Sequence, residues 1–371
     1  MKNKRPSVKV DWKELYSILI AQFRQLNKLT IGPLDRLQSR EYQFLTEKVK
    51  ELQTNNDLSD RALLSAFLMY EWPQLLAQGI SLLQEIPNTP TRVLEIGSGT
   101  APFALAALMS GSLEAFTLHD NPLTLKVAGE VCGRYGYPIS VREHDPRLTR
   151  DWPLDGKWDL IIIGYSLTNL FPTLEKQISF ISNLFNKVNP DGHILLVDSS
   201  QNDINRHFLT LRDALTKEGI SIQAPCIWQG NCPALSHGAS PCYSQRPFEK
   251  PFLINDIQKS IRANTNSLKM TYFLLCPPGQ KTSHPQGERL YRVVSPPIET
   301  FKGTRHFLCG VDGKKTLGTR LTTHPKSSRA YEYLKKGDVI AISNAIELDD
   351  DLIISEETNF ILKSSFDKPL Q

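Results

Sequence analysis

The segment that most limits the fold of this chain is TRVLEIGSGTAPFALAALMSG, residues 91–111. It combines a short apolar strand, a turn containing Gly97 and Gly99, and a helical stretch rich in alanine and leucine. The glycines allow a sharp turn from strand to helix and leave room for a ligand against the backbone. Further apolar strands, separated by helical stretches, follow at residues 113–120, 139–145, 158–170, 192–200, 219–226 and 267–276. This alternation predicts a doubly wound α/β fold whose seven-stranded, largely parallel sheet is covered on both faces.

The sequence on either side of these strands has a different character. Apolar residues recur at helical spacing through most of residues 1–87, which predicts an N-terminal helical region. Residues 88–279 are predicted to form the α/β domain, with a cysteine-rich insertion at residues 224–266. Residues 280–371 are rich in glycine, proline and short strand signals, and are predicted to form a small, OB-like β domain. A chain of this length buries a substantial core without disulfides.

Three acidic residues end the first three strands of the predicted sheet. Glu95 precedes the glycine turn, where a carboxylate can bind a cationic amino group. Asp120 ends the second strand and can accept two hydrogen bonds from a ribose diol. Asp145 ends the third strand, near where an adenine ring would lie. Because the carboxyl ends of parallel strands meet at one edge of the sheet, the three acids are expected around one nucleotide-like ligand.

The turn itself favours S-adenosylmethionine over a dinucleotide. Its residues Gly97, Ser98 and Gly99, together with the acids at the strand ends, resemble the S-adenosylmethionine site of class I methyltransferases. A dinucleotide fingerprint would read G-x-G-x-x-G, whereas Ala101 and Pro102 lie in the stretch after the second glycine. We therefore expect a Rossmann-like class I methyltransferase fold, in which Ala101 replaces the usual third glycine.

No catalytic residue can be assigned from the sequence. The fourth strand runs into GYSLTNL, which is not the Asn/Asp-Pro-Pro-aromatic turn that grips an exocyclic amine in many amino-methyltransferases. Tyr165, Ser166 and Asn169 are expected at the carboxyl edge of the sheet, but none is an obvious base or nucleophile. An active methyltransferase and a retained fold with lost or weak chemistry both stay open.

Three of the six cysteines lie close together in the insertion. Cys226, Cys232 and Cys242 are separated by five and nine residues, among glycines, prolines and polar residues. In a cytosolic chain such a group is more often a metal site than a set of disulfides. Structural zinc sites usually rely on C-x₂₋₄-C pairs, which this chain lacks. The wider spacing favours an iron–sulfur cluster, with zinc as the alternative.

A cubane cluster needs a fourth ligand, and the candidates are Cys132, Cys276, Cys309 and His237. Cys226 is predicted at the carboxyl edge of the sheet, where the insertion leaves the sixth strand. The seventh strand runs antiparallel in this fold, so Cys276 at its end lies on the order of 20 Å away or more. Cys132, in the helix after the second strand, is typical of a core residue. Cys309 is therefore favoured, provided that the C-terminal domain folds back over this edge, and Cys276 stays the alternative.

The net charge of +4 conceals an uneven distribution. Residues 1–50 carry eleven Lys/Arg against five Asp/Glu. Residues 301–336 carry nine against two, with His306 and His324 in addition, whereas the tail from Gly337 is acidic. Two basic segments suit a polyanionic partner such as RNA, although solvated surfaces of this charge are also common.

Several motifs resemble one known family, the methyltransferase-like proteins of the small ribosomal subunit found in bacteria and mitochondria. They are VLEIGSG, DLIIIGYSLTNL, APC with CP six residues on, PCYSQR, and RVVSPP followed by HFLCGVDG and KKGD, within roughly residues 55–340. The resemblance implies a class I methyltransferase fold, a four-cysteine [4Fe-4S] site and association with the small subunit during assembly. Ile227, Trp228 and Pro241 depart from the family, which commonly has Pro-His after the first cysteine and Trp before the third. Carried over by position, the cluster ligands are Cys226, Cys232, Cys242 and Cys309, and the cofactor turn is Glu95, Gly97, Ser98 and Gly99.

These observations lead to one principal hypothesis and two alternatives. The chain is expected to be a cytoplasmic factor, monomeric off the ribosome, that binds the small ribosomal subunit or its rRNA and carries a [4Fe-4S] cluster. The first alternative is an active S-adenosylmethionine-dependent methyltransferase, and the second is a sensor of iron or redox state. No apolar run approaches the roughly 20 residues of a membrane-spanning helix, and no secretory signal is evident, so a membrane partner is not expected.

Overall fold

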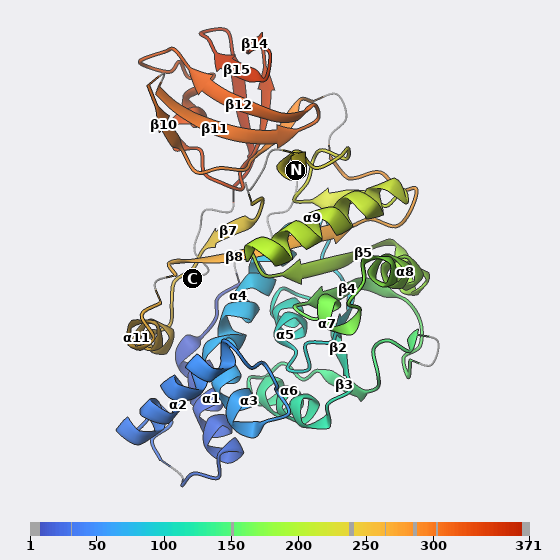
Figure 1. The fold of residues 1–371 in the computed structure, drawn as a ribbon, viewed down its shortest axis with the longest axis vertical. Coiled ribbons are helices and arrows are strands. Elements are labelled where there is room, and N and C mark those ends of the chain that lie inside the picture. The colour runs from blue at the N-terminus through green and yellow to red at the C-terminus, as the bar shows by residue number, and fades with distance from the viewer. Residues whose placement is uncertain are drawn as a thin grey trace.

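The N-terminal part of the chain is helical, as predicted. The computed structural model describes residues 8–30, 32–149, 152–236, 241–263, 265–284, 288–301 and 303–365. In Figure 1 the blue N-terminal helices lie at one end of the molecule and the orange and red β region at the other. The helices are α1 (Trp12–Leu26), α2 (Ser39–Leu52), α3 (Arg61–Tyr70) and α4 (Trp72–Leu83). None of the helices in the described ranges is long and apolar enough to cross a membrane.

The central sheet has the strand order β3-β2-β1-β4-β5-β8-β6. Strands β1 to β5 are parallel, whereas β8 runs antiparallel to both β5 and β6. This order, with a single reversed strand near the edge, confirms the predicted class I methyltransferase fold. The strands are β1 (Arg92–Ile96), β2 (Glu114–His119), β3 (Ser140–Glu143), β4 (Trp158–Gly164), β5 (Val188–Asp198), β6 (Ile222–Ala224) and β8 (Ser267–Leu275).

Both faces of this sheet are buried, because neighbouring residues of one strand enter different cores. Val93 packs in a core shared with the N-terminal helices, α5, α6 and α11 (Phe252–Ser260), whereas Leu94 packs in the core beneath α8 and α9. The N-terminal helices therefore cover one face of the sheet rather than forming a separate core. The helices between the strands are α5 (Pro102–Met109), α6 (Pro122–Arg134), α7 (Leu167–Leu170), α8 (Leu174–Leu184) and α9 (Asn202–Lys217).

The insertion between β6 and β8 contains short regular elements. They are α10 (Pro233–Ser236), β7 (Ser244–Pro247) and α11 (Phe252–Ser260). Strand β7 pairs antiparallel with the beginning of β8, so the insertion extends the sheet at its carboxyl edge. The cysteine-bearing part has no regular apolar period in its sequence, and most of it is irregular in the structure as well.

The C-terminal strands form a second sheet with a core of its own (Figure 1). Its order is β14-β15-β12-β11-β9-β13-β16, with β10 paired to β11. The side chains of Tyr291, Leu308 and Leu317 are fully buried in that core. The division of the chain at residues 87 and 279 stays a prediction. The elements are β9 (Leu290–Val293), β10 (Ile298–Thr300), β11 (Gly303–Gly310), β12 (Gly313–Thr319), η3 (Arg329–Tyr333), β13 (Val339–Ser343), β14 (Ile346–Leu348), β15 (Asp351–Ile354) and β16 (Asn359–Ser364).

Candidate functional site

The glycine turn after β1 is packed so closely that only glycine fits at two positions. Gly97 has φ +81°, and a Cβ there would lie 2.6 Å from the hydroxyl oxygen of Ser166. Gly99 has φ +71°, and a Cβ there would lie 2.5 Å from the hydroxyl oxygen of Thr124. Both values of φ favour glycine, and both contacts are far shorter than a carbon atom tolerates. The turn is therefore held between the segments that follow β4 and β2.

Ala101 occupies the position of the usual third glycine and adopts a left-handed conformation, with φ +56°. Such a backbone costs an alanine about 1–2 kcal/mol, which the surrounding contacts must offset. The indole N–H of Trp72 donates to the carbonyl of Thr100 at 2.9 Å, so helix α4 holds the turn from the N-terminal side. The backbone N–H of Ala101 donates to the hydroxyl of Ser98 at 3.3 Å. The turn keeps its shape without the third glycine.

Glu95 is completely buried beneath this turn. Its Oε2 accepts the backbone N–H of Ala104 at 2.6 Å, in the first turn of α5. Burial raises the pKa of the carboxyl to about 7, although hydrogen bonds with Ser98 and Ala104 oppose the shift. Glu95 therefore fixes helix α5 against the glycine turn, and a direct contact with a bound amino group stays a prediction.

Asp120 and Asp145 follow the neighbouring parallel strands β2 and β3. Half or more of the Asp120 side chain is exposed, and the neighbouring His119 uses its Nδ1 to accept the backbone N–H of Asn121 at 2.9 Å. Because burial also lowers the pKa of His119, its 3.3 Å contact with Asp120 is not an ion pair. Asp145 instead forms a bidentate pair with Arg147, at 2.6 and 2.8 Å, which lowers the pKa of that carboxyl. Asp120 is thus free to accept hydrogen bonds, whereas Asp145 already has a cationic partner.

The segment after β4 supports the turn more than it offers catalytic groups. The hydroxyl of Ser166 donates to the carbonyl of Ile96 at 3.1 Å. The hydroxyl of Tyr165 donates to Oε1 of Gln78 in α4 at 2.9 Å, and burial raises its pKa. Asn169 is exposed on α7. Two of the three side chains expected at this edge are therefore engaged in structural hydrogen bonds.

Two further carboxylates at this edge were missed by the sequence analysis. Burial raises the pKa of Asp198, at the end of β5, to about 6. Burial also raises the pKa of Glu71, between α3 and α4, to about 7. Burial is the main cause of the raised pKa of Tyr165, and the charges of both acids add to it, so both lie near this side chain. Asp198 could have been found by the rule that located Asp120, because it also ends a parallel strand. Groups whose pKa values lie near neutrality are typical of sites that bind or transfer protons.

The structure places the four predicted cysteine ligands close enough for their charges to act on one another. Burial, with a smaller contribution from the charge of Cys226, raises the pKa of Cys232 to about 11 and that of Cys242 to about 12. Burial also raises the pKa of Cys309, and the charges of the other three thiols add to the shift. Cys226 and Cys242 line one small cavity. In the parts of the chain that are described, no three His, Cys, Asp or Glu side chains are grouped closely enough to hold a single metal ion.

The other candidates for the fourth ligand lie elsewhere or outside the described residues. Cys276 follows β8 at the opposite edge, where its N–H donates to the carbonyl of Ser221 at 2.9 Å, and burial alone raises its pKa. Cys132 is buried in the core on α6. His237 lies outside the described residues. Cys309 lies in β11, paired with Arg292 of β9, and is the candidate that joins the group.

A buried arginine on α9 fixes the irregular segment that carries the first two cysteines. The guanidinium of Arg212 is 1% exposed and donates to the carbonyls of Trp228 and Gly230 and to the carboxylate of Asp213. Asp213 in turn accepts the backbone N–H of Cys232 at 2.9 Å. The positive charge of Arg212 opposes the rise in the pKa of Cys232 that burial causes, which places a cation beside the thiols.

A known protein family matches a part of the chain that includes most of this site. The family model described as "Mitochondrial small ribosomal subunit Rsm22" matches residues 67–339, well over half of the chain. The chain belongs to the Rsm22 family. Over 99 residues it is also 29% identical to the ribosomal protein L11 methyltransferase of Symbiobacterium thermophilum, covering 26% of this chain and 31% of that protein. The chain thus spans about a third of the length of that curated relative.

Two solved methyltransferase structures show a distant likeness to this Rsm22 family member. The N-methyltransferase NodS of Bradyrhizobium japonicum is 14% identical, covers 56% of this chain and 97% of its own, and has a TM-score of 0.36. The plantazolicin methyltransferase BpumL is 15% identical, covers 62% of this chain and 98% of its own, and has a TM-score of 0.37. The assignment of the fold accordingly rests on the strand order of the sheet.

A buried ionic network joins the two sheets of this Rsm22 family member beside the cysteines. Glu85, just after α4, accepts hydrogen bonds from Arg246 of β7 at 2.6 Å and from Tyr272 of β8 at 2.7 Å. Two further bonds, both of 3.0 Å, come from Arg292 of β9 in the second sheet. Arg292 also lines the small cavity of Cys226. Burial alone would lower the pKa of the arginine, but the charge of Glu85, with a smaller contribution from Cys226, raises it. No sequence motif indicated this junction.

Proposed function

We propose that this Rsm22 family member acts in assembly of the small ribosomal subunit and binds its rRNA. The observation that carries the proposal is the family match over residues 67–339. The excess of seven positive charges in residues 301–336 supports it, because phosphate contacts supply most of the affinity of sequence-independent nucleic-acid binding. Such a factor works where small subunits are assembled, in the cytoplasm or the mitochondrial matrix.

We further propose that Cys226, Cys232, Cys242 and Cys309 hold a [4Fe-4S] cluster. The donor set supports this, because four thiolates are the usual ligands of such a cluster. Around a single zinc ion the four sulfurs would lie only about 3.8 Å apart, given Zn–S bonds of about 2.3 Å, whereas the larger cubane core accepts ligands from more widely separated positions. The buried charge of Arg212 beside the thiols supports it as well, because a cation offsets the negative charge of a thiolate-ligated cluster.

The cluster's role in this proposal is structural. When bound, it would supply four Fe–S bonds that connect the insertion, through its three cysteines, to β11 of the second sheet through Cys309. The chain's own residues prepare this connection. Arg212 and Asp213 fix the backbone of the insertion, and Glu85 holds the two sheets together next to it. The surface that carries the basic residues 301–336 would then have one orientation relative to the central sheet.

We propose S-adenosylmethionine as the ligand of the glycine turn. The close packing of the turn and the exposed carboxylate of Asp120 support its binding. A second candidate function, methyl transfer to RNA or another substrate, is favoured by Asp198 and Glu71, whose pKa values of about 6 and about 7 suit proton transfer at neutral pH. Calorimetric titration with S-adenosylmethionine tests the turn, and the absence of binding heat would contradict it.

Cosedimentation with small ribosomal subunits tests the principal proposal. The protein should sediment with the subunits at about 50 mM salt and dissociate at about 200 mM, because neutralised phosphates release counterions. Lys326→Glu and Arg329→Glu change exposed residues of the basic segment and should weaken binding at low salt. Lys126→Glu, at an exposed position of α6, is the matched control and should leave binding unchanged. Failure of the unaltered protein to sediment at low salt would contradict the proposal.

A further inference from the structure

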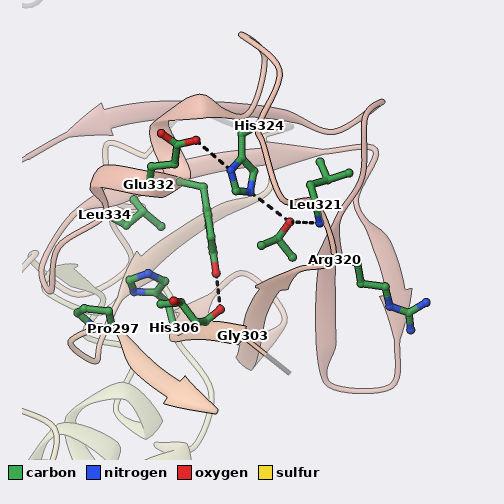
Figure 2. A pocket seen from close by; sticks show the side chains of 11 residues that line it. Pro297, Gly303, His306, Arg320, Leu321, His324, Glu332 and Leu334 are labelled. Carbon is green, nitrogen blue, oxygen red and sulfur yellow. Dashed lines mark hydrogen bonds and ion pairs between the residues drawn. The ribbon is translucent and has the colours of Figure 1, made fainter. Parts of the chain in front are cut away.

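A second cavity, far in sequence from the glycine turn, opens in the C-terminal β region. It has a volume of about 540 Å³ and is lined by residues of β11, of the segment after β12 and of η3 (Figure 2). Cavities that bind small organic ligands range over roughly 300–1,000 Å³, so this one is large enough for a nucleoside. Nothing in the predicted chemistry of the S-adenosylmethionine site or the cysteines uses it.

The cavity contains a buried polar group that has no partner in the described residues. His306 of β11 is 3% exposed, and its Nδ1 has no hydrogen-bond partner among them. Burial lowers the pKa of the ring, so at neutral pH the imidazole is uncharged and has one donor and one acceptor nitrogen. A buried polar atom left without a partner is destabilising. A ligand that offers a hydrogen-bonding edge would remove this penalty.

Three rings line the cavity, and two of them are held in place by hydrogen bonds. The ring of Tyr331 lies 5.5 Å from that of His306 and 5.2 Å from that of His324. The hydroxyl of Tyr331 donates to the carbonyl of Thr304. His324 contacts the hydroxyl of Thr319 and the carboxylate of Glu332, each at 3.1 Å (Figure 2). Fixed rings are a suitable surface for stacking a nucleobase, because little ordering is required on binding.

The surroundings of the cavity are positively charged. Arg320 lies at its edge and is exposed (Figure 2). Lys326 and Arg329, in the segment that leads from Arg320 to η3, are exposed as well. Two acids are close by, and both already have a partner: Glu332 contacts His324, and Glu299, whose charge acts on His306, accepts the hydroxyl of Thr304 at 2.8 Å. Phosphates on either side of a bound base would therefore meet cations that have no acidic partner within the described ranges of the chain.

We propose that this cavity binds one unpaired nucleotide of single-stranded RNA, with the base against Tyr331 and His306 and the flanking phosphates near Arg320. The proposal rests on the proposed function, because it names how rRNA would be contacted. An RNA strand is favoured over a free nucleotide because the cations are distributed along the segment from Arg320 to Arg329 rather than gathered around one phosphate group. Specific RNA recognition commonly takes this form, with an unstacked base held by rings and hydrogen bonds.

The test is fluorescence anisotropy with a labelled ten-nucleotide single-stranded RNA of mixed sequence, titrated with the full chain. His306→Leu removes the unpartnered nitrogen at similar volume. We expect it to weaken RNA binding about tenfold without lowering the melting temperature. His193→Leu changes a histidine of β5 in the central sheet and should leave RNA affinity unchanged. Unchanged RNA affinity in folded His306→Leu would overturn the proposal, and so would competition by free AMP at equal concentration.

A second measurement covers the case in which His306→Leu does not fold. RNA containing 4-thiouridine, irradiated on the unaltered protein, should crosslink to peptides from the cavity, and crosslinks confined to residues 1–50 would overturn the proposal. Different results would contradict the proposed function and the assignment of the cavity. If the protein does not sediment with small subunits at low salt, the proposed function is wrong. If it sediments but neither crosslinks at the cavity nor responds to His306→Leu, the cavity assignment is wrong.

Discussion

Glu85→Gln removes a negative charge that pairs with two buried arginines at the junction of the sheets. Only 5% of the Glu85 side chain is exposed, and its carboxylate accepts four hydrogen bonds, three of them from Arg246 and Arg292. Glutamine has nearly the same shape but no charge, and its amide N–H groups would face guanidinium groups. Breaking a buried ion pair from one side costs about 3–5 kcal/mol.

The expected change in melting temperature follows from the size of the chain. An entropy of unfolding of about 2.1 cal/mol/K per residue gives roughly 0.8 kcal/mol/K for this protein, so the loss corresponds to about 4–6 °C. Burial alone would raise the pKa of Glu85, but Arg292 and Arg246 lower it below the ordinary value. The ion pair therefore contributes stability above the ordinary carboxyl pKa, and this contribution is lost as the pH falls. Thermal unfolding of the two proteins should differ most near pH 7 and least in acid.

A matched substitution distinguishes the effect of breaking this junction from the effect of removing any one negative charge. Glu114→Gln removes an acid of β2 that is 59% exposed and lies 3.3 Å from Arg92. An exposed pair of this kind contributes less than about 1 kcal/mol. If Glu85→Gln lowers the melting temperature no more than Glu114→Gln does, the network does not hold the two sheets together.

Three further substitutions test the site around the glycine turn. Because the pKa of Glu95 is raised to about 7, the folded state retains a proton that the unfolded state releases, and stability falls as the pH rises from about 4.5 to 7. Glutamine has no proton to lose, so the free energy of unfolding of Glu95→Gln, measured in urea, should rise by up to about 3 kcal/mol relative to that of the unaltered protein between pH 5 and pH 8. A difference between the two proteins that does not change with pH would contradict the raised pKa. Gly99→Ala places a Cβ 2.5 Å from Thr124 and should lower the free energy of unfolding by about 1–3 kcal/mol in the same assay. The same substitution should abolish S-adenosylmethionine binding in calorimetry. Asp120→Asn should weaken that binding about tenfold with unchanged stability, because the side chain is exposed, and equal affinity would exclude a ribose contact.

The sheet could be predicted because its signals are local and periodic. Each buried strand is a short apolar run, and the glycine turn marks the first strand, so strand order follows from the fold class. The structure confirms that class. The same rule placed Asp120 at the carboxyl edge and would have placed Asp198 there too, since both end parallel strands.

The packing around the turn could not be predicted, because it depends on contacts between distant segments. Gly97 requires its small size because of Ser166, about 70 positions further along the chain. Glu85 has an unremarkable sequence context, and its partner Arg292 is 207 positions away. Neither relation leaves a period or a motif in the sequence.

The cysteines are an intermediate case. Strand direction alone separated Cys276 from the other thiols, because an antiparallel last strand ends at the far edge of the sheet. The placement of Cys309 depended on how the second sheet folds back, which spacing does not encode. Arg212 was missed because an arginine on a helix gives no sign that its side chain turns inward to hold carbonyls of another segment.

The most direct test of the account is the iron and acid-labile sulfide content of anaerobically purified Cys309→Ser, measured beside Cys276→Ser. The unaltered protein and Cys276→Ser should each contain about four iron and four sulfide per chain with broad visible absorbance, whereas Cys309→Ser should lose most of both. Cluster loss in Cys276→Ser with retention in Cys309→Ser would contradict the interdomain site. A colourless unaltered protein with one zinc per chain would contradict the cluster itself.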